Sequence, residues 1–547
     1  MTDQYTPISK LDRFGIAAAI IILIIQIYAL DGFSNTKNDD AFISFRYARN
    51  LAENGELSYN VHPDFLPESS QNVQEREFDR RVEGYSNFLW TLLLAGIFLV
   101  KLPMPQTAYF LSTVSAVLLL LFLILWMHRQ RAFESEVSIS MPALIMASIP
   151  SVALWSSTGM ETLFFSWMIV LACLLMSVEN RSDRNGWSSG VAWAAATLIR
   201  PEGLFFAFGT ICLSYLEYGA YKEKLKSFLQ RLSIVVLIVI THFMWRKFYY
   251  GEWLPNTYYA KVGPLQFLGS DGLAYLEKFL VSGGALLILL VIGGLFIRPR
   301  IDGIWTLSVL TYLYIGYIIA VGGDWMPGFR MFIPLLPFLI MIASLTLARI
   351  ISYYRIIGST LCFILMANLM GGGWYYLKGN WIHSTFHQLI TQQEFVDIHK
   401  VLGLKLKKIK QDMLLEDPFD IPRLAIHPAG KVPYYSEMET IDMRGLCDWH
   451  IARVPFEVKN QTMPGHHRRD VDYVLSLKPD FVVLSGASLK KGITPSISPR
   501  TEAPGLDRFD ILTHRVFRQC YEREIVDMDV GVKNLEYYRR ICPDDNL

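Results

Sequence analysis

The 547-residue sequence has few charged residues: Asp, Glu, Lys and Arg make up 18% of it, against about 25% in soluble proteins. The shortage is uneven, because residues 1–372 hold long apolar runs whereas residues 373–547 have an ordinary soluble composition. The formal net charge is only +1 and no basic tract occurs, so the sequence does not predict a nucleic-acid partner. It predicts a membrane domain (1–372) followed by a soluble domain (373–547).

Sequence motifs of nucleotide and metal enzymes are also missing. The chain has no P-loop, no G-x-G-x-x-G after a predicted strand, no H-E-x-x-H and no nucleophile elbow. Its six cysteines show no C-x-x-C or zinc-ligand spacing. In an extracytoplasmic domain Cys520 and Cys542 could pair, which would leave Cys447 as an odd thiol. A nucleotide-driven cytoplasmic reaction therefore has no visible site.

Apolar runs long enough to cross a bilayer recur along the first 372 residues. The first, Phe14–Leu30, follows basic residues and lacks a small-residue cleavage site, so we expect an uncleaved helix with a cytoplasmic N-terminus. Residues 86–101 are apolar but short, and we expect them to lie along the membrane interface. Residues 189–218 contain "LIRPEG" and are expected to form a hairpin of two short helices. The other expected spans centre on residues 107–127, 141–156, 161–178, 233–249, 283–297, 304–321, 331–348 and 356–372, which gives about eleven crossings in all.

The basic loops orient these spans. Lys and Arg concentrate in the loops at 128–131, 180–185, 221–231, 298–300 and 348–355, and such loops are cytoplasmic. The first loop (31–106) and the C-terminal domain then lie outside the cytoplasm. The loops rich in aromatic residues, Gly and Pro collect on that same outer face, which predicts that the protein acts there.

Two adjacent carboxylates, Asp39 and Asp40, open the first outer loop. One interpretation is that they only cap the helix predicted from residue 41, since Asp is a good N-cap residue. The other is chemical: one carboxylate is a general base that deprotonates a sugar hydroxyl, and the other binds an acceptor or an ion. Neighbouring side chains diverge, so both are not expected to act on one atom.

Basic residues at the other outer loops are candidates for binding phosphate. Arg200 lies two residues before Glu202 inside the apolar hairpin, where the alternative is a mutual ion pair that locks the hairpin. Arg330 follows Asp324 in "GGDWMPGFR", which can equally be a simple turn between spans. Lys261 lies in "YYGEWLPNTYYAK", whose aromatic residues are also typical of a membrane-interface belt.

Six segments together resemble a known family: "DDAFISFRYARNLAENGELSYN", "RVEGYSNFLWTLLLA", "SSTGMET", "LIRPEGLFF", "YYGEWLPNTYYAK" and "GGDWMPGFRMFIPLLPFL". They are similar to the membrane glycosyltransferases of the GT-C superfamily, above all to the terminal β-arabinofuranosyltransferases of mycobacteria and their relatives for pilin or surface glycans. The resemblance runs in order over most of the chain and includes "GKVPYYSEMETIDMRGLCDWHIA" in the soluble part. One departure is the charged insert at 62–81, which puts the acceptor in doubt.

The resemblance implies a polytopic α-helical GT-C fold with juxtamembrane helices and a C-terminal extracytoplasmic α/β domain, in a bacterial inner membrane. It implies a polyprenyl-phosphate donor, with D-arabinofuranose as the sugar, and a glycan or a protein such as a pilin as the acceptor. Asp39 or Asp40 would be catalytic. The donor phosphate would be bound by Arg200, Lys261 and Arg330. The residues expected to line the site are Arg46, Glu83, Tyr85, Glu161, Glu202, Asn256, Tyr258, Asp324 and Trp325.

The sequence leaves several points open. It specifies no cofactor, although two carboxylates leave room for a divalent cation. It does not fix whether transfer retains or inverts the anomeric configuration. A lipid-linked sugar transporter or flippase is the alternative function, because broken helices and buried charges also mark transporters. A third interpretation is an assembly factor that acts through the soluble domain alone.

Overall fold

The computed structural model describes residues 9–37, 39–61, 77–130, 137–181, 185–218, 222–262, 265–296, 303–324, 326, 328–377, 397–418, 421–455, 468–484, 489–490, 511–526 and 533–543. The chain forms two compact units. The first comprises residues 1–34, 105–241 and 264–387, and the second comprises residues 35–104, 242–263 and 388–547. The first loop thus folds in one unit with the C-terminal region. Most of the charged insert, residues 62–76, and Trp325 lie outside the described residues.

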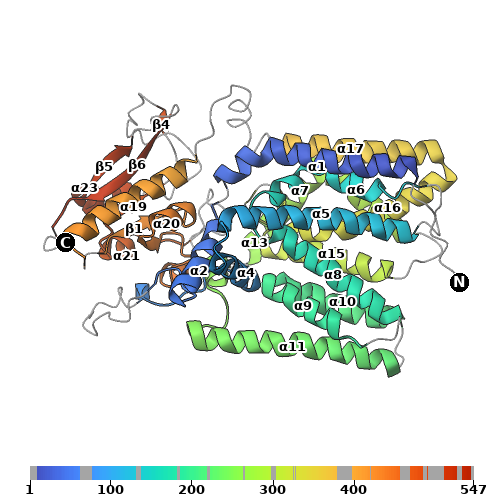
Figure 1. The fold of residues 1–547 in the computed structure, drawn as a ribbon, viewed down its shortest axis with the longest axis horizontal. Coiled ribbons are helices and arrows are strands. Elements are labelled where there is room, and N and C mark those ends of the chain that lie inside the picture. The colour runs from blue at the N-terminus through green and yellow to red at the C-terminus, as the bar shows by residue number, and fades with distance from the viewer. Residues whose placement is uncertain are drawn as a thin grey trace. The chain divides into compact units, whose positions relative to one another are not determined.

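The first unit is a helical bundle (Figure 1). Within the described residues, eight helical segments are long and apolar enough to cross a membrane, which together with the many apolar side chains exposed on their surfaces makes this a multi-pass membrane protein. The helices are α1 (Lys10–Lys37), α5 (Met104–Gln130), α6 (Met141–Ala147), α7 (Pro150–Ser156), α8 (Thr162–Arg181), α9 (Trp187–Ile199), α10 (Glu202–Tyr218), α11 (Lys222–Tyr250), α13 (Leu265–Phe279), α14 (Ala285–Gly294), α15 (Ile304–Val321), α16 (Leu336–Tyr353) and α17 (Arg355–Leu377).

One helix lies at the centre of this bundle. The apolar window of α16 and of the short 3₁₀ helix η2 (Arg330–Leu335) before it is entirely buried. Around α16 pack α6, α14, α15 and α17. The peripheral helices α1, α11 and α17 instead expose apolar side chains such as Phe14, Leu237 and Phe363, as expected of surfaces that face lipid.

Two breaks interrupt the apolar helices of this unit. Residues 141–156 were expected to form one helix, but they form the two short helices α6 and α7, because Ile149 is extended (φ −101°, ψ 105°) ahead of Pro150. Proline disfavours the helical conformation in the residue before it. The second break is the π-helical segment η1 (Leu280–Gly284), where Gly283 has φ 104°. A Cβ atom there would lie 2.6 Å from the carbonyl oxygen of Asn368 in α17, so only glycine fits.

The expected hairpin over residues 189–218 is present. Helix α9 ends at Ile199, Arg200 is extended (φ −150°, ψ 140°), and α10 begins at Glu202. Pro201 ends α9, since a residue before proline leaves the helical region. Residues 86–101, expected to be a short interfacial helix, contain the 12-residue apolar helix α4 (Phe88–Leu99).

The second unit contains a mixed sheet with the strand order β2-β1-β3-β6-β4, in which β5 also pairs with β6. Strand β1 (Arg423–Ile426) is parallel to β2 (Glu439–Asp442) and to β3 (Phe481–Val483), with Leu424 opposite Thr440 and Phe481. The remaining strands are β4 (Leu489–Lys490), β5 (Tyr521–Val526) and β6 (Lys533–Arg540). Strand β6 is antiparallel to each of its partners β3, β4 and β5. This confirms the α/β C-terminal domain expected from the apolar runs at 423–427 and 480–486.

Helices cover both faces of this sheet. Leu424 and Ile426 face α19 (Ile398–Glu416) and α20 (Lys431–Ser436), while Ala425 faces α21 (Val471–Ser476) and α23 (Arg515–Cys520). The alternation follows from the two-residue period of a strand. Cys520 and Cys542 form a disulfide, and Cys447 is a buried free thiol, as the sequence suggested.

A further apolar cluster binds the first loop to this domain. It joins Ile43 and Tyr47 of α2 (Ala41–Asn54), Ala260 of α12 (Asn256–Lys261), and Ala429 and Leu446 of the C-terminal region. Three stretches far apart in the sequence therefore share one core, which is why they form a single compact unit.

Candidate active site

Asp39 binds the C-terminal domain. Its two carboxylate oxygens accept the backbone N–H groups of Gly430 (2.7 Å) and Lys431 (2.8 Å), at the start of α20. A Cβ atom on Gly430 would lie 1.9 Å from the carbonyl oxygen of Asp39, so the contact needs glycine at this position. Asp39 thus caps a helix almost 400 residues away in the sequence, rather than the helix that follows it.

Asp40 occupies the N-cap position of α2, and its backbone carbonyl accepts the N–H of Ile43 at 3.1 Å. The sequence suggested that Asp40 could simply cap the helix that follows it. Its side chain, however, makes no capping hydrogen bond to α2. The side chain is half-buried, on a helix whose first ten residues are all buried. Of the two carboxylates, Asp39 has a clear structural task and Asp40 does not have the capping role.

Arg46 is buried and holds the first loop together. Its guanidinium donates to the carbonyl oxygens of Tyr59 (2.6 Å), Met438 (2.7 Å) and Pro433 (2.8 Å), and to the side chain of Asn60 (3.0 Å). Because these acceptors come from both the first loop and the C-terminal domain, the geometry favours a structural role for Arg46 over contact with a substrate.

Glu83 and Arg246 form a buried ion pair. The Arg246 guanidinium donates to both carboxylate oxygens, at 2.5 and 3.1 Å, and the two side chains are 6% or less exposed. Burial raises the pKa of Glu83 to about 7, although the Arg246 charge opposes this rise. The sequence reasoning missed Arg246, for which the signal was the pair of adjacent charges, Arg246 and Lys247, near the end of the apolar run in α11.

Tyr85 and Asn256 are likewise buried and bonded within the second unit. The Tyr85 hydroxyl lies 3.2 Å from that of Tyr250. The Asn256 amide donates to the carbonyl oxygens of Gly445 (2.8 Å), Asp448 (2.9 Å) and Leu446 (3.0 Å), and its own oxygen accepts from Arg453. These contacts fix the 249–261 loop on the C-terminal domain.

Tyr258 and Lys261 differ from these residues in their exposure. Tyr258 is 46% exposed and Lys261 is half-buried, and both lie on α12. Residues three apart on a helix share one face. Helix α12 therefore presents an aromatic ring and an ammonium group together, a combination suited to a sugar and an anion.

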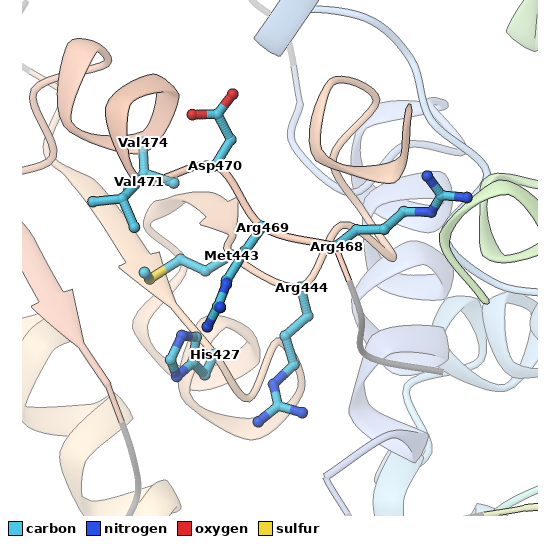
Figure 2. A pocket seen from close by; sticks show the side chains of 8 residues that line it. All are labelled: His427, Met443, Arg444, Arg468, Arg469, Asp470, Val471 and Val474. Carbon is cyan, nitrogen blue, oxygen red and sulfur yellow. The ribbon is translucent and has the colours of Figure 1, made fainter. Parts of the chain in front are cut away.

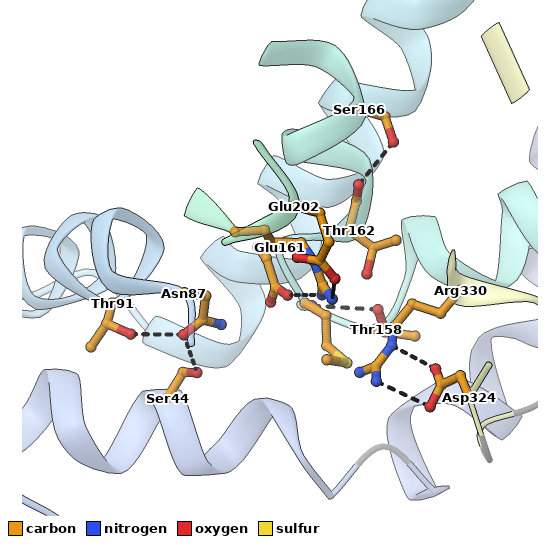
Figure 3. Close-up of polar contacts among 12 residues, drawn as sticks. Ser44, Asn87, Thr91, Thr158, Glu161, Thr162, Ser166, Glu202, Asp324 and Arg330 are labelled. Atoms are coloured by element: carbon orange, nitrogen blue, oxygen red, sulfur yellow. Dashed lines mark hydrogen bonds and ion pairs between the residues drawn. The ribbon is translucent and has the colours of Figure 1, made fainter. Parts of the chain in front are cut away.

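The hairpin tip in the first unit carries an arginine between two carboxylates. Arg200 donates to Glu161 (2.6 Å) and to Glu202 (2.8 Å), and all three side chains are at most 13% exposed. The mutual ion pair weighed from the sequence is thus present, with a second carboxylate added by Glu161 (Figure 3). As a phosphate ligand, Arg200 would have to exchange a carboxylate for the phosphate.

Asp324 and Arg330 form the second ion pair of this unit. The Arg330 guanidinium lies 2.7 Å and 3.1 Å from the two carboxylate oxygens of Asp324, as Figure 3 shows. Trp155 supports the turn between them by donating its indole N–H to the carbonyl oxygen of Gly328 at 2.7 Å. Arg330 begins η2, which packs on α8.

An apolar pocket lies where the helix breaks of the first unit meet. Its lining comes from the α6–α7 break (Ile149), from the η1 break (Gly284) and from the stretch around η2 (Phe329, Phe332). Phe279 and Phe332 stack in it with ring centroids 3.9 Å apart. Arg330 lies between the lining residues Phe329 and Phe332 in the sequence, and its guanidinium is paired with Asp324.

Within the described residues no group of three or more His, Cys, Asp or Glu side chains is arranged to hold a metal ion. Several charged residues of the predicted site instead bind one another, as Arg200 and Arg330 do with carboxylates, or bind backbone groups, as Asp39 and Arg46 do.

His450 is a titratable residue that joins the first loop to the C-terminal domain. Its two ring nitrogens lie 2.6 Å from Glu77 and 2.9 Å from Asp470, and its ring stacks on Tyr473 at 4.0 Å. Burial alone would lower the pKa of His450, but the hydrogen bonds to Asp470 and Glu77 outweigh it and raise that pKa.

This arrangement predicts a pH-dependent stability. Because the pKa of His450 is higher in the folded state than in the unfolded state, its protonated ring stabilises the fold fully at a pH below the unfolded-state pKa of about 6.5. This stabilisation is lost as the pH rises through the folded-state pKa. We expect His450→Gln to lower the Tm more at about pH 6 than at about pH 9. His514→Gln, which removes a pairing with the exposed Asp472, is the control. An equal loss of Tm at both pH values in His450→Gln would contradict the prediction.

Two solved structures share this fold. The crystal structure of ArnT from Cupriavidus metallidurans bound to undecaprenyl phosphate matches with a TM-score of 0.55 and 11% identity, and the match covers 96% of this chain and 97% of that one. The cryo-EM structure of the arabinofuranosyltransferase AftD from Mycobacteria matches with a TM-score of 0.51 and 12% identity. That match covers 99% of this chain but 40% of AftD, so this chain spans less than half of that protein.

At these identities the likeness shows the fold: the chain has the GT-C fold that its motifs led us to expect. A family model described as "Domain of unknown function (DUF8728)" matches residues 407–527, within the C-terminal domain. No curated protein matches the sequence.

Proposed function

We propose that the protein is a glycosyltransferase that moves a sugar from a polyprenyl-phosphate donor to a glycan or protein acceptor outside the cytoplasm. The observation that carries the proposal is the likeness, over nearly the whole of both chains, to a structure that binds undecaprenyl phosphate. The resemblance of the sequence motifs to arabinofuranosyltransferases supports D-arabinofuranose as the sugar. A pilin is one such protein acceptor.

The apolar pocket and Arg330 support an amphiphilic donor. An isoprenoid chain is hydrocarbon, which suits the lining around Phe279, Phe329 and Phe332. Its phosphate needs a cation, and Arg330 and Arg200 belong to the same unit. Both arginines are paired with carboxylates, so a donor phosphate competes for them. Lys261, on α12 beside Tyr258, is the third candidate ligand.

Asp40 is the base in this proposal, and Asp39 positions the loop that carries it. The Asp40 carboxylate takes the proton of an acceptor hydroxyl, and the hydroxyl oxygen forms a bond to the anomeric carbon of the donor sugar. The bond from that carbon to the phosphate oxygen breaks, and polyprenyl phosphate leaves with the electron pair. Charge then builds on the phosphate, where a fixed cation lowers the barrier most.

Location outside the cytoplasm, in a bacterial inner membrane, is part of the proposal. The disulfide between Cys520 and Cys542 supports it, since disulfides persist in oxidising compartments. The basic loops support the same orientation, with the N-terminus in the cytoplasm.

The proposal is tested with purified protein in lipid bilayers. We expect consumption of synthetic polyprenyl-phosphate D-arabinofuranose and transfer to one member of an acceptor panel. The same donor with a ribose or glucose head group measures the sugar preference. If no polyprenyl-linked sugar is consumed but such a lipid moves between leaflets, the protein is a flippase and the proposal is wrong.

A further inference from the structure

The parallel part of the C-terminal sheet brings a cluster of arginines to one edge. Strands β2, β1 and β3 are parallel, so their carboxyl ends meet at the same edge. His427 follows β1, and Met443 and Arg444 follow β2. The stretch 468–470 leads into α21, and the chain continues from the end of α21 into β3. The beginning of α21 therefore lies at the edge where β3 ends. In open α/β sheets ligands bind outside the carboxyl ends of the strands.

A pocket lies at this edge, with about 400 Å³ of empty space that includes its opening to solvent. Its polar lining consists of three guanidinium groups, one imidazole and one carboxylate, and its apolar floor comes from Val471, Val474 and Met443. Figure 2 shows the Arg469 side chain extending toward His427, with Arg444 reaching along the neighbouring loop and Arg468 pointing away from both.

Hydrogen bonds hold the polar groups of this pocket in place. The Nδ1 atom of His427 lies 2.7 Å from the carbonyl oxygen of Leu484. Because a carbonyl oxygen only accepts, Nδ1 carries the proton, and the opposite nitrogen Nε2 is the hydrogen-bond acceptor of the ring. The backbone N–H of Arg444 donates to Asp442 at 3.0 Å. Arg468 donates to the carbonyl oxygens of Val262 and Val454, which fixes the stretch that carries Arg469.

The carboxylate in the lining is already engaged elsewhere. Asp470 accepts the N–H of Tyr473 at 2.9 Å and pairs with His450 at 2.9 Å. Figure 2 shows its side chain directed away from those of Arg469 and His427. Basic side chains outnumber the single carboxylate in the lining, which suits an anion with several acceptor oxygens.

We propose that this pocket is a second binding site, which takes an oxyanion group, a phosphate ester or a carboxylate, carried by a sugar-sized ligand. Arg444 and Arg469 bind the oxyanion with charge-assisted hydrogen bonds, and Nε2 of His427 accepts a hydrogen bond from a hydroxyl group of the sugar. The apolar floor accommodates one face of the sugar. The inference stands on the C-terminal sheet alone and does not depend on the transfer reaction.

The test is calorimetric titration of the full-length protein in lipid nanodiscs, at constant ionic strength because salt screens such sites. The probes are inorganic phosphate, glucose 1-phosphate, glucuronate and, as the neutral control, glucose. We expect one of the anions to bind and glucose not to bind. Preference for glucose 1-phosphate identifies a phosphate ester as the ligand group, and preference for glucuronate identifies a carboxylate.

Arg444→Gln/Arg469→Gln is expected to weaken that binding at least about tenfold, the loss of one or more charge-assisted hydrogen bonds. Arg515→Gln, an exposed arginine on α23, is the matched control and should bind as the wild type does. Circular dichroism and Tm show whether the double variant is folded. Equal binding by the wild type and the folded double variant, or no binding of any anion to the wild type, would overturn the proposal.

Discussion

Asp40→Asn is expected to reduce sugar transfer by about 10²–10⁴-fold, the range that general-base catalysis supplies. Asparagine keeps the shape of the side chain but cannot take the acceptor proton. The Asp40 side chain does not cap α2, so the capping contribution of about 0.5–2 kcal/mol is not lost in this variant. The measurement is the initial rate of transfer from polyprenyl-phosphate D-arabinofuranose, with the Tm of the same preparation.

Asp39→Asn should behave differently. Its two oxygens accept backbone N–H groups at the start of α20. The asparagine side chain has only one carbonyl oxygen, so it can accept only one of these two hydrogen bonds, and it carries no negative charge. We expect a loss of about 1.5–3 kcal/mol in stability, visible as a lower Tm. Gly430→Ala is the matched variant, because its methyl group disrupts the same contact and leaves both carboxylates in place.

The pair of variants separates the two roles. Should Asp40→Asn retain full transfer while Asp39→Asn loses it at an unchanged Tm, Asp39 would be the base and our assignment would be reversed. A low Tm in both Asp39→Asn and Gly430→Ala, with activity lost in proportion to folded protein, supports the positioning role.

Arg246→Met is expected to destabilise the protein by about 3–5 kcal/mol, the cost of leaving one charge of a buried ion pair without its partner. Glu83 would keep its buried position, 3% exposed, with no cation beside it. Its pKa, already about 7, would rise further. The loss relative to the wild type should therefore grow as the pH rises through about 7, where the wild-type Glu83 gives up its proton and the variant carboxyl does not, and shrink in acid, where Glu83 is protonated in both proteins.

The matched variant is Glu83→Met/Arg246→Met, which removes both charges and fills the site with apolar side chains. We expect it to be far more stable than Arg246→Met, because replacing a buried pair by packed apolar groups is often neutral. Arg539→Met, which breaks an exposed pair with Glu524, should cost less than about 1 kcal/mol. Chemical denaturation in mild detergent at several pH values measures all three, and a double variant as unstable as the single one would refute the explanation.

The sequence by itself determined the class of protein and the position of most helices. Runs of about 20 apolar residues have few stable structures other than membrane helices, because backbone polar groups must be satisfied inside a bilayer. The hairpin at Arg200–Pro201, the α/β domain and the pairing of Cys520 with Cys542 were also readable, since they depend on local chemistry or on spacing. The break at Ile149 was missed, although Pro150 marked it.

Only the tertiary structure decided what the charged residues do. Asp39 and Asp40 are alike in sequence, yet one binds Gly430 and Lys431 from the C-terminal domain and the other does not cap its own helix. Arg46 and Glu83 have the residue types of a site, but their partners are carbonyl groups and Arg246. A side chain's role depends on the neighbours that folding brings within about 3 Å, and those neighbours come from parts of the chain that local patterns cannot relate.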